Sequence, residues 1–473
     1  MRPIKRNLIV LLFSCFVFAA TMVTAQGGPG PGRGGYKPSE IVCRVDSTTT
    51  IDDINELFRT TTRGHQIQTD CFLLFVTGGR NADSLSTLIS QMAGVIYCSP
   101  NYYLMAPEGL QGSSAFPDLE RTGDMATQLA AVELDLTETH LAATGTDVKV
   151  AIIDGGVNLT HPYFAEQTGD LVPVWDYVDN DANPLDEEGG ANSGHGTFVA
   201  GITCLVAPAA DLLIYRVLDT AGFGDGFTIA TAVLRAIDDG CRVINLSLGM
   251  TGMHEGLDDA LKLARQRDIL VVAAAGNDST DAPSEFPFPA SRDYCLAVAA
   301  LDSALLKADF SNYGTPIDFC APGTRVYAPY LDSLYAWWDG TSFSTPFVGG
   351  LAALLCERYP VASWGDLYTA IHNSAHNVDT INQTFAGLLG AGQIYPLKAL
   401  GASFGFMRGD LNGDTTVTLG DVMALVAYLF VLEDSPSPGL VADCNCDGQL
   451  SLSDAMAIVS LLFIDGEPLC PVP

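Results

Sequence analysis

The sequence predicts an α/β protein built on a parallel sheet, with a small α+β module before it and a small all-α module after it. Three observations lead to this prediction. Between about residues 145 and 400, short apolar segments alternate with longer segments of helical periodicity, which is typical of a parallel sheet covered on both faces. Residues 40–105 have a separate order of strand, helix, strand, helix and strand. Near the end, two Asp- and Asn-rich segments repeat at an offset of 33 residues, and an apolar helix follows each.

Residues 1–25 predict a secretory signal peptide. Arg2, Lys5 and Arg6 make a basic start, the apolar stretch "LIVLLFSCFVFAA" follows, and "VTA" supplies the small residues that a signal peptidase reads. A membrane anchor is the alternative, but the stretch leads into this cleavable sequence, and no later segment reaches the length of a membrane-spanning helix. We therefore expect a secreted, extracellular protein whose residues 26–37 form a flexible Gly/Pro-rich linker.

The charge of the chain limits its partners. With 55 acidic and 23 basic residues the formal net charge is −32 at pH 7, which argues against nucleic acids and against anionic membrane surfaces. The same balance favours bound cations. Adaptation to high salt is an alternative, but charged residues are only 16% of the chain, so a scarcity of Lys and Arg explains the balance equally well.

A small two-layer α+β module is predicted for residues 38–107. Its expected strands are "EIVCRV", "CFLLFV" and "GVIYCSPNYYL", and its expected helices are "DDINELFRT" and "ADSLSTLISQM". The pattern of apolar residues alone does not reveal what this module does.

The 12 cysteines show no zinc-binding spacing. An oxidising compartment permits disulfides, although buried free cysteine is also a common small hydrophobic residue. We expect one disulfide in the tail, from Cys444 or Cys446 to Cys470.

Two polar side chains come at the ends of apolar strands in the central region. Asp154 ends "VKVAIID", and Asn277 directly follows "ILVVAAAG". In a parallel α/β sheet the functional residues lie at the carboxyl ends of the strands. A dinucleotide-binding fold is the natural alternative, but "IIDGGVN" lacks the G-x-G-x-x-G turn and has an acid where a phosphate would bind.

His195 and Ser342 each stand at the expected start of an apolar helix. His195 lies in "NSGHGTFVAGI" and Ser342 in "GTSFSTPFVGG". Taken alone, a serine at a helix start is usually a cap, and a histidine in a Gly-rich turn is usually structural. Together with Asp154, however, they follow the order Asp, His, Ser that one group of serine hydrolases uses.

At this point the chain resembles the subtilisin-like serine proteases, through "VAIIDGGVN", "GHGTFVAGI", "INLSLG", "AAAGN" and "GTSFSTP" in that order over about 250 residues. The resemblance implies a peptidase domain over residues 108–402. It implies that Ser342 is the nucleophile, that His195 is the general base and acid, and that Asp154 orients His195. The Asn277 side-chain amide and the Ser342 backbone N–H would then form the oxyanion hole. No cofactor is expected for catalysis.

The resemblance also implies where a peptide substrate binds. "SLG", which is Ser247, Leu248 and Gly249, would pair with an extended substrate backbone. Ala274, Ala275 and Gly276 would form a small apolar wall, so we expect a preference for apolar residues before the scissile bond.

The chain departs from the family pattern at several points. Gly155 replaces the usual Ser or Thr after the aspartate, Phe198 replaces a frequent His, and Phe343 replaces a common Met beside the nucleophile. Because a thioether is absent next to Ser342, we expect tolerance to peroxide. "GITCLVAPAADLLIYRVLD" leaves almost no room for the calcium-binding loop that subtilisins commonly insert there, so we expect that site to be absent.

The small module resembles the inhibitor-type propeptides of this family, because "GVIYCSPNYYL" is similar to their last strand. This resemblance implies self-cleavage between about residues 104 and 125. A permanent accessory domain is the alternative.

The tail, residues 406–473, resembles a type I dockerin through "GDLNGDTTVTLGD" and "ADCNCDGQLSLSD". The resemblance implies two calcium loops with ligands at positions 1, 3, 5, 9 and 12. These ligands are Asp410, Asn412, Asp414, Thr418 and Asp421 in the first loop, and Asp443, Asn445, Asp447, Ser451 and Asp454 in the second.

The tail also departs from the dockerin pattern. Thr415 replaces a usual Gly of the first loop. The positions that often carry a Ser/Thr pair for cohesin binding hold Leu419 and Gly420, and then Leu452 and Ser453. A cohesin-like partner and another cell-surface protein are both open.

The sequence thus favours a secreted, self-processing serine endopeptidase with a structural calcium-binding tail. One alternative is a catalytically silent binding protein that displays the dockerin-like module. Another is an esterase with the same three residues. An extended "SLG" edge, which suits a peptide backbone, argues against the esterase.

Overall fold

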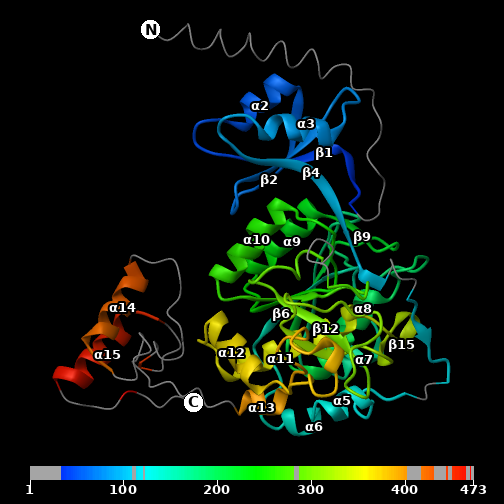
Figure 1. Ribbon diagram of the computed structural model, residues 1–473, viewed down its shortest axis with the longest axis vertical. Helices are drawn as coiled ribbons and strands as arrows, with labels where there is room; N and C mark the ends of the chain where they lie inside the picture. The colour runs from blue at the N-terminus through cyan, green and yellow to red at the C-terminus, as the bar shows by residue number, and fades with distance from the viewer. Residues whose placement is uncertain are drawn as a thin grey trace. The chain divides into compact units, whose positions relative to one another are not determined.

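The computed structural model describes residues 34–108, 113–120, 123–281, 287–401, 417–430, 444–445, 450–464 and 469. They form two compact units, the first mainly from residues up to Leu104 and the second mainly from Met105 onward (Figure 1). The expected signal peptide and most of the expected linker lie outside the described residues. Within the described part of the chain, no helix has the length and apolar character needed to cross a membrane.

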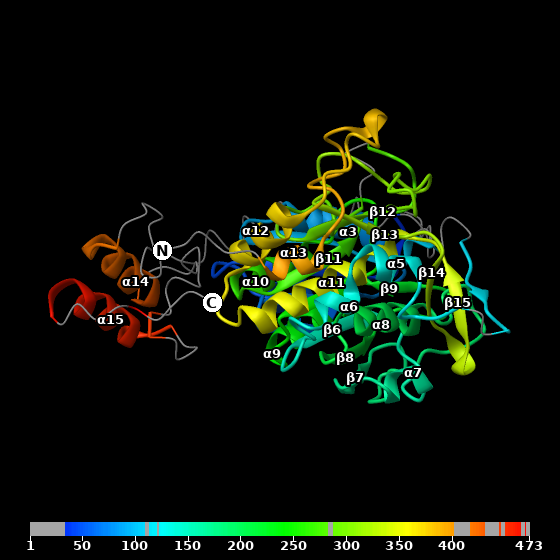
Figure 2. The ribbon, with the colours of Figure 1, turned by 90° about the horizontal axis from the view of Figure 1, so that it is seen from below.

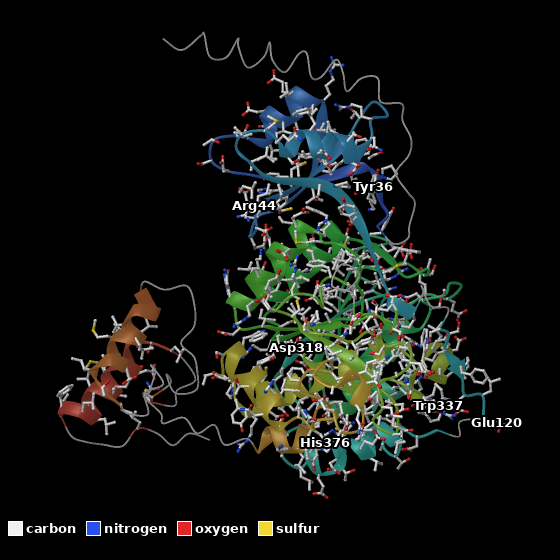
Figure 3. The ribbon with its side chains drawn as sticks, viewed as in Figure 1. Tyr36, Arg44, Glu120, Asp318, Trp337 and His376 are labelled. Atoms are coloured by element: carbon white, nitrogen blue, oxygen red, sulfur yellow. A yellow bond between two sulfur atoms is a disulfide. The ribbon has the colours of Figure 1, made fainter. Side chains whose placement is uncertain are left out.

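The first unit contains the α+β module that the sequence predicts. Its strands pair in the order β2-β3-β1-β4, and all these pairs are antiparallel. Tyr36 and Arg44 mark the two ends of β1 in Figure 3. The elements are β1 (Tyr36–Val45), α2 (Ile51–Phe58), β2 (Thr60–Gln66), β3 (Cys71–Val76), α3 (Ala82–Ser90) and β4 (Val95–Met105).

Two features of this unit were not predicted. The sequence of β2, "TTTRGHQ", has no apolar side chain, so no period-2 pattern marks it as a strand, and pairing with β3 is what orders it. A disulfide joins Cys43 to Cys98, which lie directly opposite each other on β1 and β4. Of the cysteines expected to pair in the tail, Cys446 and Cys470 lie outside the described residues.

The second unit contains a parallel sheet, which confirms the predicted fold class. Its strands lie in the order β13-β12-β11-β10-β6-β8-β7, and every pair is parallel. The strands of this sheet are β6 (Lys149–Asp154), β7 (Leu171–Asp176), β8 (Asp211–Arg216), β10 (Val243–Leu246), β11 (Leu270–Ala274), β12 (Leu296–Leu301) and β13 (Phe319–Pro322). A separate three-stranded antiparallel sheet contains β5 (Phe116–Pro117), β14 (Val326–Pro329) and β15 (Tyr335–Trp338), and the short strand β9 (Phe223–Asp225) belongs to neither of these two sheets.

Helices cover both faces of this sheet. In Figure 1, α9 and α10 lie on one side of the sheet and α11 on the other, and Figure 2 shows α8 beside α11. The helices are α5 (Leu129–Glu133), α6 (Leu136–Thr139), α7 (Pro162–Ala165), α8 (His195–Val206), α9 (Gly226–Asp238), α10 (Glu255–Gln266), α11 (Thr341–Arg358), α12 (Trp364–Ser374) and α13 (Pro396–Leu400), with 3₁₀ turns at Leu331–Ser333 and Gln383–Phe385. Burial on both faces explains why strands such as β10 and β11 are continuously apolar.

At the edge of the unit, β15 pairs with both β14 and β5. Trp337 of β15, labelled in Figure 3, lies opposite Phe116 of β5. This pairing ties β5 to the body of the second unit.

The tail contains two helices, as predicted. They are α14 (Leu419–Phe430) and α15 (Leu452–Phe463), and they pack through Val422, Leu425, Ala455 and Ile458, with Cys444 in the same cluster. Asp421 and Asp454 lie in the first turns of these helices and are fully buried.

Candidate active site

The four residues predicted for catalysis lie on different elements of the second unit and are brought together. Asp154 ends β6, His195 is the first residue of α8, Ser342 is in the first turn of α11, and Asn277 follows β11. The side chains of all four are buried, with at most 4% of any residue exposed. The strand ends and the two helix starts therefore meet at one place, where a fifth residue, Glu108, contacts three of the four.

Asp154 and His195 form a hydrogen-bonded pair. Asp154 Oδ1 accepts from His195 Nδ1 at 2.8 Å and from the Gly155 backbone N–H at 2.7 Å. The other carboxylate oxygen, Oδ2, is buried without a hydrogen-bond partner among the described residues. With Nδ1 committed to Asp154, the imidazole turns Nε2 toward the position where Ser342 and Glu108 lie.

The charges around His195 favour its protonated form. Burial by itself lowers the pKa of His195, but Asp154 and then Glu108 outweigh burial and raise the pKa to about 10. An imidazolium between two carboxylates is therefore the stable state of this arrangement.

The start of α8 is held by a residue that the sequence analysis did not identify, Asp186. The helix begins after Gly194, which has φ +86° and supplies no side-chain cap. Instead, Asp186 Oδ1 accepts from the Gly194 N–H at 2.8 Å, and Oδ2 accepts from the Thr197 N–H at 3.1 Å and from Thr197 Oγ1 at 2.7 Å. Asp186 thus acts as a remote N-cap for the helix that carries His195.

Close packing around Asp186 explains two glycines. A Cβ on Gly196 would clash with the carbonyl oxygen of Gly156, and a Cβ on Gly156 would clash with the backbone of Leu185. Backbone therefore packs directly against backbone at this point. The three segments involved are the one after Asp154, the one that carries Asp186 and the start of α8. The sequence around Asp186 did not indicate that it caps α8, because Asp186 lies in a long polar loop. The three groups that donate to its carboxylate belong to residues 8 to 11 positions later in the chain.

We expect Asp186→Asn to lower kcat for peptide hydrolysis by about ten- to a hundredfold and to leave KM nearly unchanged. The carboxylate accepts with both oxygens, whereas an amide has one acceptor oxygen, so one N–H at the start of α8 would face an NH₂ group and His195 would move. Steady-state kinetics with a peptide substrate measures the split. Glu188→Gln, an exposed neighbour, is the matched control. A loss of thermal stability with unchanged kcat would mean that Asp186 has no positioning role.

Proline and serine residues fix the backbone of Ser342. Pro346 lies inside α11 and has no N–H, so it cannot donate to the carbonyl oxygen of Ser342 four residues earlier. Ser247 Oγ donates to that oxygen instead, at 2.8 Å. The predicted nucleophile is thereby tied to the "SLG" segment that follows β10.

Two N–H donors converge beside Ser342. The Asn277 side-chain amide donates from Nδ2 to Glu108 Oε1 at 3.0 Å, and the Ser342 backbone N–H donates to the same oxygen at 3.4 Å. Asn277 is held in this orientation because its Oδ1 accepts from the Thr341 N–H at 3.0 Å and from Thr341 Oγ1 at 2.8 Å. A single oxygen therefore lies between the two donors that the sequence analysis predicted for an oxyanion hole.

Glu108 is the second residue that the sequence analysis missed. Its Oε2 accepts from Ser342 Oγ at 2.6 Å and lies 3.2 Å from His195 Nε2. Only 2% of Glu108 is exposed. Burial raises the pKa of its carboxyl, but hydrogen bonds and charge from His195, with further hydrogen bonds from Ser342 and Asn277, outweigh burial and lower that pKa.

The residues predicted to bind substrate lie at the carboxyl ends of β10 and β11. Gly249 exchanges two backbone hydrogen bonds with Met105, of 2.9 and 2.8 Å, in an antiparallel bridge. The Ala106 N–H donates to the Gly222 carbonyl at 3.2 Å on the other side. The "SLG" segment therefore pairs with an extended strand in this chain, and that strand is Met105 and Ala106. The remaining predicted residues, Ser247, Leu248, Ala274, Ala275 and Gly276, are all buried.

An aromatic cluster packs behind His195. Phe343 lies 5.3 Å from the His195 ring and 4.6 Å from Phe198, and Trp338 lies 4.9 Å from Phe343, measured between ring centroids. The two Phe residues that depart from the family pattern therefore contact each other.

We expect this cluster to resist oxidation. Activity should persist after exposure to hydrogen peroxide, whereas Phe343→Met should lose most of its activity, because a thioether beside Ser342 can be oxidised to a polar sulfoxide. Residual peptide hydrolysis after a timed exposure measures the difference. Equal sensitivity of the two chains would mean that oxidation acts at another site.

The predicted calcium ligands are only partly described. Asp410, Asn412, Asp414, Asp443 and Asp447 lie outside the described residues. Of the others, Asp454 Oδ1 accepts from the backbone N–H groups of Cys444 at 2.8 Å and Asn445 at 3.2 Å, and Oδ2 accepts from that of Ser451 at 2.9 Å. Asp421 accepts in the same way from the Thr418 N–H at 2.7 Å. Both acids therefore accept backbone N–H groups, and Asp454 closes a capping box with Ser451 at the start of α15. Among the described residues, no group of three or more His, Cys, Asp or Glu side chains is placed to hold a metal ion.

The chain is similar to known proteins in two regions. The family model described as "Subtilase family" matches residues 145–392, and the model described as "Dockerin type I domain" matches residues 408–462. Thermitase from Thermoactinomyces vulgaris is 40% identical over 246 residues, which cover 50% of this chain and 84% of the relative. Subtilisin Savinase from Lederbergia lenta is 37% identical over 260 residues, which cover 52% of this chain and 90% of the relative.

Solved structures agree with the fold. Fervidolysin from Fervidobacterium pennivorans, described as a keratinolytic enzyme related to subtilisin, superposes with a TM-score of 0.65 over 81% of this chain and 63% of that chain. The two sequences are 21% identical, so this likeness supports the fold alone.

Proposed function

The chain belongs to the subtilase family of serine proteases, and we propose that it hydrolyses peptide bonds through Ser342, His195 and Asp154. One observation carries the assignment of these residues. A single carboxylate, that of Glu108, is bound at once by Ser342 Oγ, His195 Nε2, the Ser342 N–H and the Asn277 amide. These are the groups that a tetrahedral intermediate needs, and they converge on one point.

The geometry supports the following steps. With the site open, His195 Nε2 accepts the Ser342 Oγ proton while Oγ attacks the substrate carbonyl carbon. The negative oxygen that forms accepts from the Ser342 N–H and from Asn277 Nδ2. The carbonyl re-forms as the C–N bond breaks, and His195 gives its proton to the leaving amine. Water then repeats the sequence on the acyl-enzyme, while Asp154 keeps Nδ1 protonated throughout.

Substrates would bind as an extended strand along Ser247–Gly249, beside the wall formed by Ala274–Gly276. The Met105–Gly249 bridge supports this mode, because it is the backbone pairing that a bound peptide would make. The wall is small and apolar, so the preferred residue before the scissile bond is apolar. Digestion of a denatured protein and a peptide library, with products identified by mass spectrometry, tests this preference. Hydrolysis of esters without peptides, or no hydrolysis at all, would contradict the proposal.

Residues 38–107 would act as a propeptide that the enzyme removes from itself, between about residues 104 and 125, after export directed by residues 1–25. The substrate-like pairing of Met105 supports this reading. A secreted, extracellular product follows.

The tail would bind calcium as a structural ion and present a surface for a cohesin-like or other cell-surface protein. Calcium would join the oxygen ligands of each loop to the acid in the helix that follows, Asp421 or Asp454.

Calcium removal should loosen the tail. The experiment uses the Ser342→Ala chain, which cannot digest itself, and measures the rate at which an added protease cuts residues 408–462. This rate should be about 100-fold higher with a chelator than with calcium present at about 100 times its Kd. Asp454→Asn should reproduce part of this increase with calcium present. Equal cutting rates with and without the chelator would contradict calcium binding.

A further inference from the structure

Glu108 occupies the proposed oxyanion site with a side chain instead of a backbone carbonyl. Oε1 accepts from the Asn277 amide at 3.0 Å and from the Ser342 N–H at 3.4 Å. Oε2 accepts from Ser342 Oγ at 2.6 Å and lies 3.2 Å from His195 Nε2. One carboxylate therefore bridges the nucleophile and its base and fills the position that a substrate oxygen needs.

Pro107 explains why a side chain, and not the main chain, enters this site. Met105 is paired with Gly249, so an antiparallel ladder that continued would bring residue 107 opposite Ser247. Residue 107 is proline and has no N–H to donate to the Ser247 carbonyl. Ser342 Oγ lies 3.3 Å from that carbonyl, and residues 107 and 108 leave the extended conformation. The ladder ends before the nucleophile, and the next side chain reaches into the site.

We propose that Pro107 and Glu108 form an internal inhibitor, in which the Glu108 carboxylate keeps the uncleaved chain latent until it leaves the oxyanion site. This inference rests on the proposed function and adds a mode of regulation to it. The carboxylate resembles the acid product of peptide hydrolysis, yet it belongs to a side chain, so Ser342 cannot cut it. Gly340 makes room for it, because a Cβ there would clash with Glu108 Oε1.

The charges at the site support a pH-dependent release. The titratable groups around Glu108 are His195 on α8 and, behind it, Asp154 on β6. The pKa of Glu108 is lowered from its ordinary value of 4.5. The Glu108 carboxylate therefore contributes fully to latency above pH 4.5, and this contribution is lost as the pH falls through the lowered pKa. The pKa of His195 is raised to about 10, so its contribution is present below its ordinary 6.5 and is lost as the pH rises toward 10. Latency should be strongest between about pH 4.5 and 6.5.

Labelling of the full-length chain with a fluorophosphonate probe tests the proposal. The probe reacts with an accessible, activated serine, and the precursor and processed bands separate by mass, so labelling of each is read in the same sample. Freshly refolded wild type, Glu108→Ala, Glu108→Gln and Glu108→Asp are compared, with Glu138→Gln as a control at an exposed acid of α6.

We expect the Glu108→Ala precursor to label at least about tenfold faster than the wild-type precursor. Glu108→Gln should also label faster, because the amide loses the charge that pairs with His195. Glu108→Asp should label faster because the aspartate keeps the negative charge but its side chain is too short to contact Ser342 and Asn277. Glu138→Gln should match wild type. The excess of Glu108→Ala over wild type should shrink from about pH 6.5 to pH 10, since His195 loses its charge over that range.

The outcomes separate this proposal from the proposed function. Equal labelling rates of the wild-type and Glu108→Ala precursors, together with peptide hydrolysis by the processed wild type, would overturn the inhibitor and leave the protease assignment intact. Failure of every chain to label and to hydrolyse peptides would overturn the proposed function. Circular dichroism of each refolded chain identifies a variant that has not folded.

Discussion

Ser342→Ala should remain full length after refolding and should lower kcat for peptide hydrolysis by about 10⁶-fold, which is the scale known for loss of the nucleophile in subtilisins. The hydroxyl is the group that attacks, and no other hydroxyl among the described residues of the site lies where both His195 and the proposed oxyanion donors meet. The substitution keeps the Ser342 backbone N–H and the start of α11, so the fold should be retained. Intact mass, N-terminal sequence and steady-state kinetics measure the two effects.

Ser344→Ala is the matched control for this experiment. Ser344 is also buried in α11, and its hydroxyl donates to the Pro322 carbonyl at 3.1 Å, away from His195. We expect this variant to process itself and to hydrolyse peptides at a rate close to that of wild type. Processing of Ser342→Ala in a highly purified sample would show that another residue, or another protease, removes the first module.

Asp154→Asn should lower kcat by about 10⁴-fold at neutral pH, the scale known for this substitution in serine proteases. Oδ1 of Asp154 accepts from both His195 Nδ1 and the Gly155 N–H. An asparagine would turn its NH₂ group toward His195 or toward Gly155. In the first case Nδ1 becomes an acceptor and the proton moves to Nε2, so His195 can no longer take a proton from Ser342.

The kinetics of Asp154→Asn should be compared with those of Asp147→Asn. Asp147 is exposed, precedes β6 and has φ +61°, a conformation that asparagine also tolerates. The control should keep the wild-type kcat. A fall of less than about tenfold for Asp154→Asn would contradict the role of Asp154 in holding the tautomer of His195.

Local patterns in the sequence were sufficient for most of the architecture. Strands such as β6 and β11 are runs of buried apolar residues, and helices such as α10 repeat with helical period, so neighbouring residues carried the signal. Strand β2 was missed because its polar residues have no such pattern and only pairing with β3 orders them. Local position alone placed Asp154, His195 and Ser342 at a strand end and at helix starts, where a cap or a structural histidine is the usual interpretation. Their catalytic roles were proposed because their motifs resemble those of the subtilisin-like proteases.

The sequence by itself determined the α/β class, the order of the modules and the residues that close their strands and open their helices, because periodicity and turn chemistry act over a few neighbouring residues. Only the tertiary structure decided which distant groups meet. Glu108 lies 234 residues from Ser342, and Cys43 lies 55 residues from Cys98. Asp186 reaches α8 only because the loop before it folds back onto the end of β6. Such contacts depend on how separate elements pack. The residues next to each partner in the sequence therefore do not indicate which distant residue it will contact.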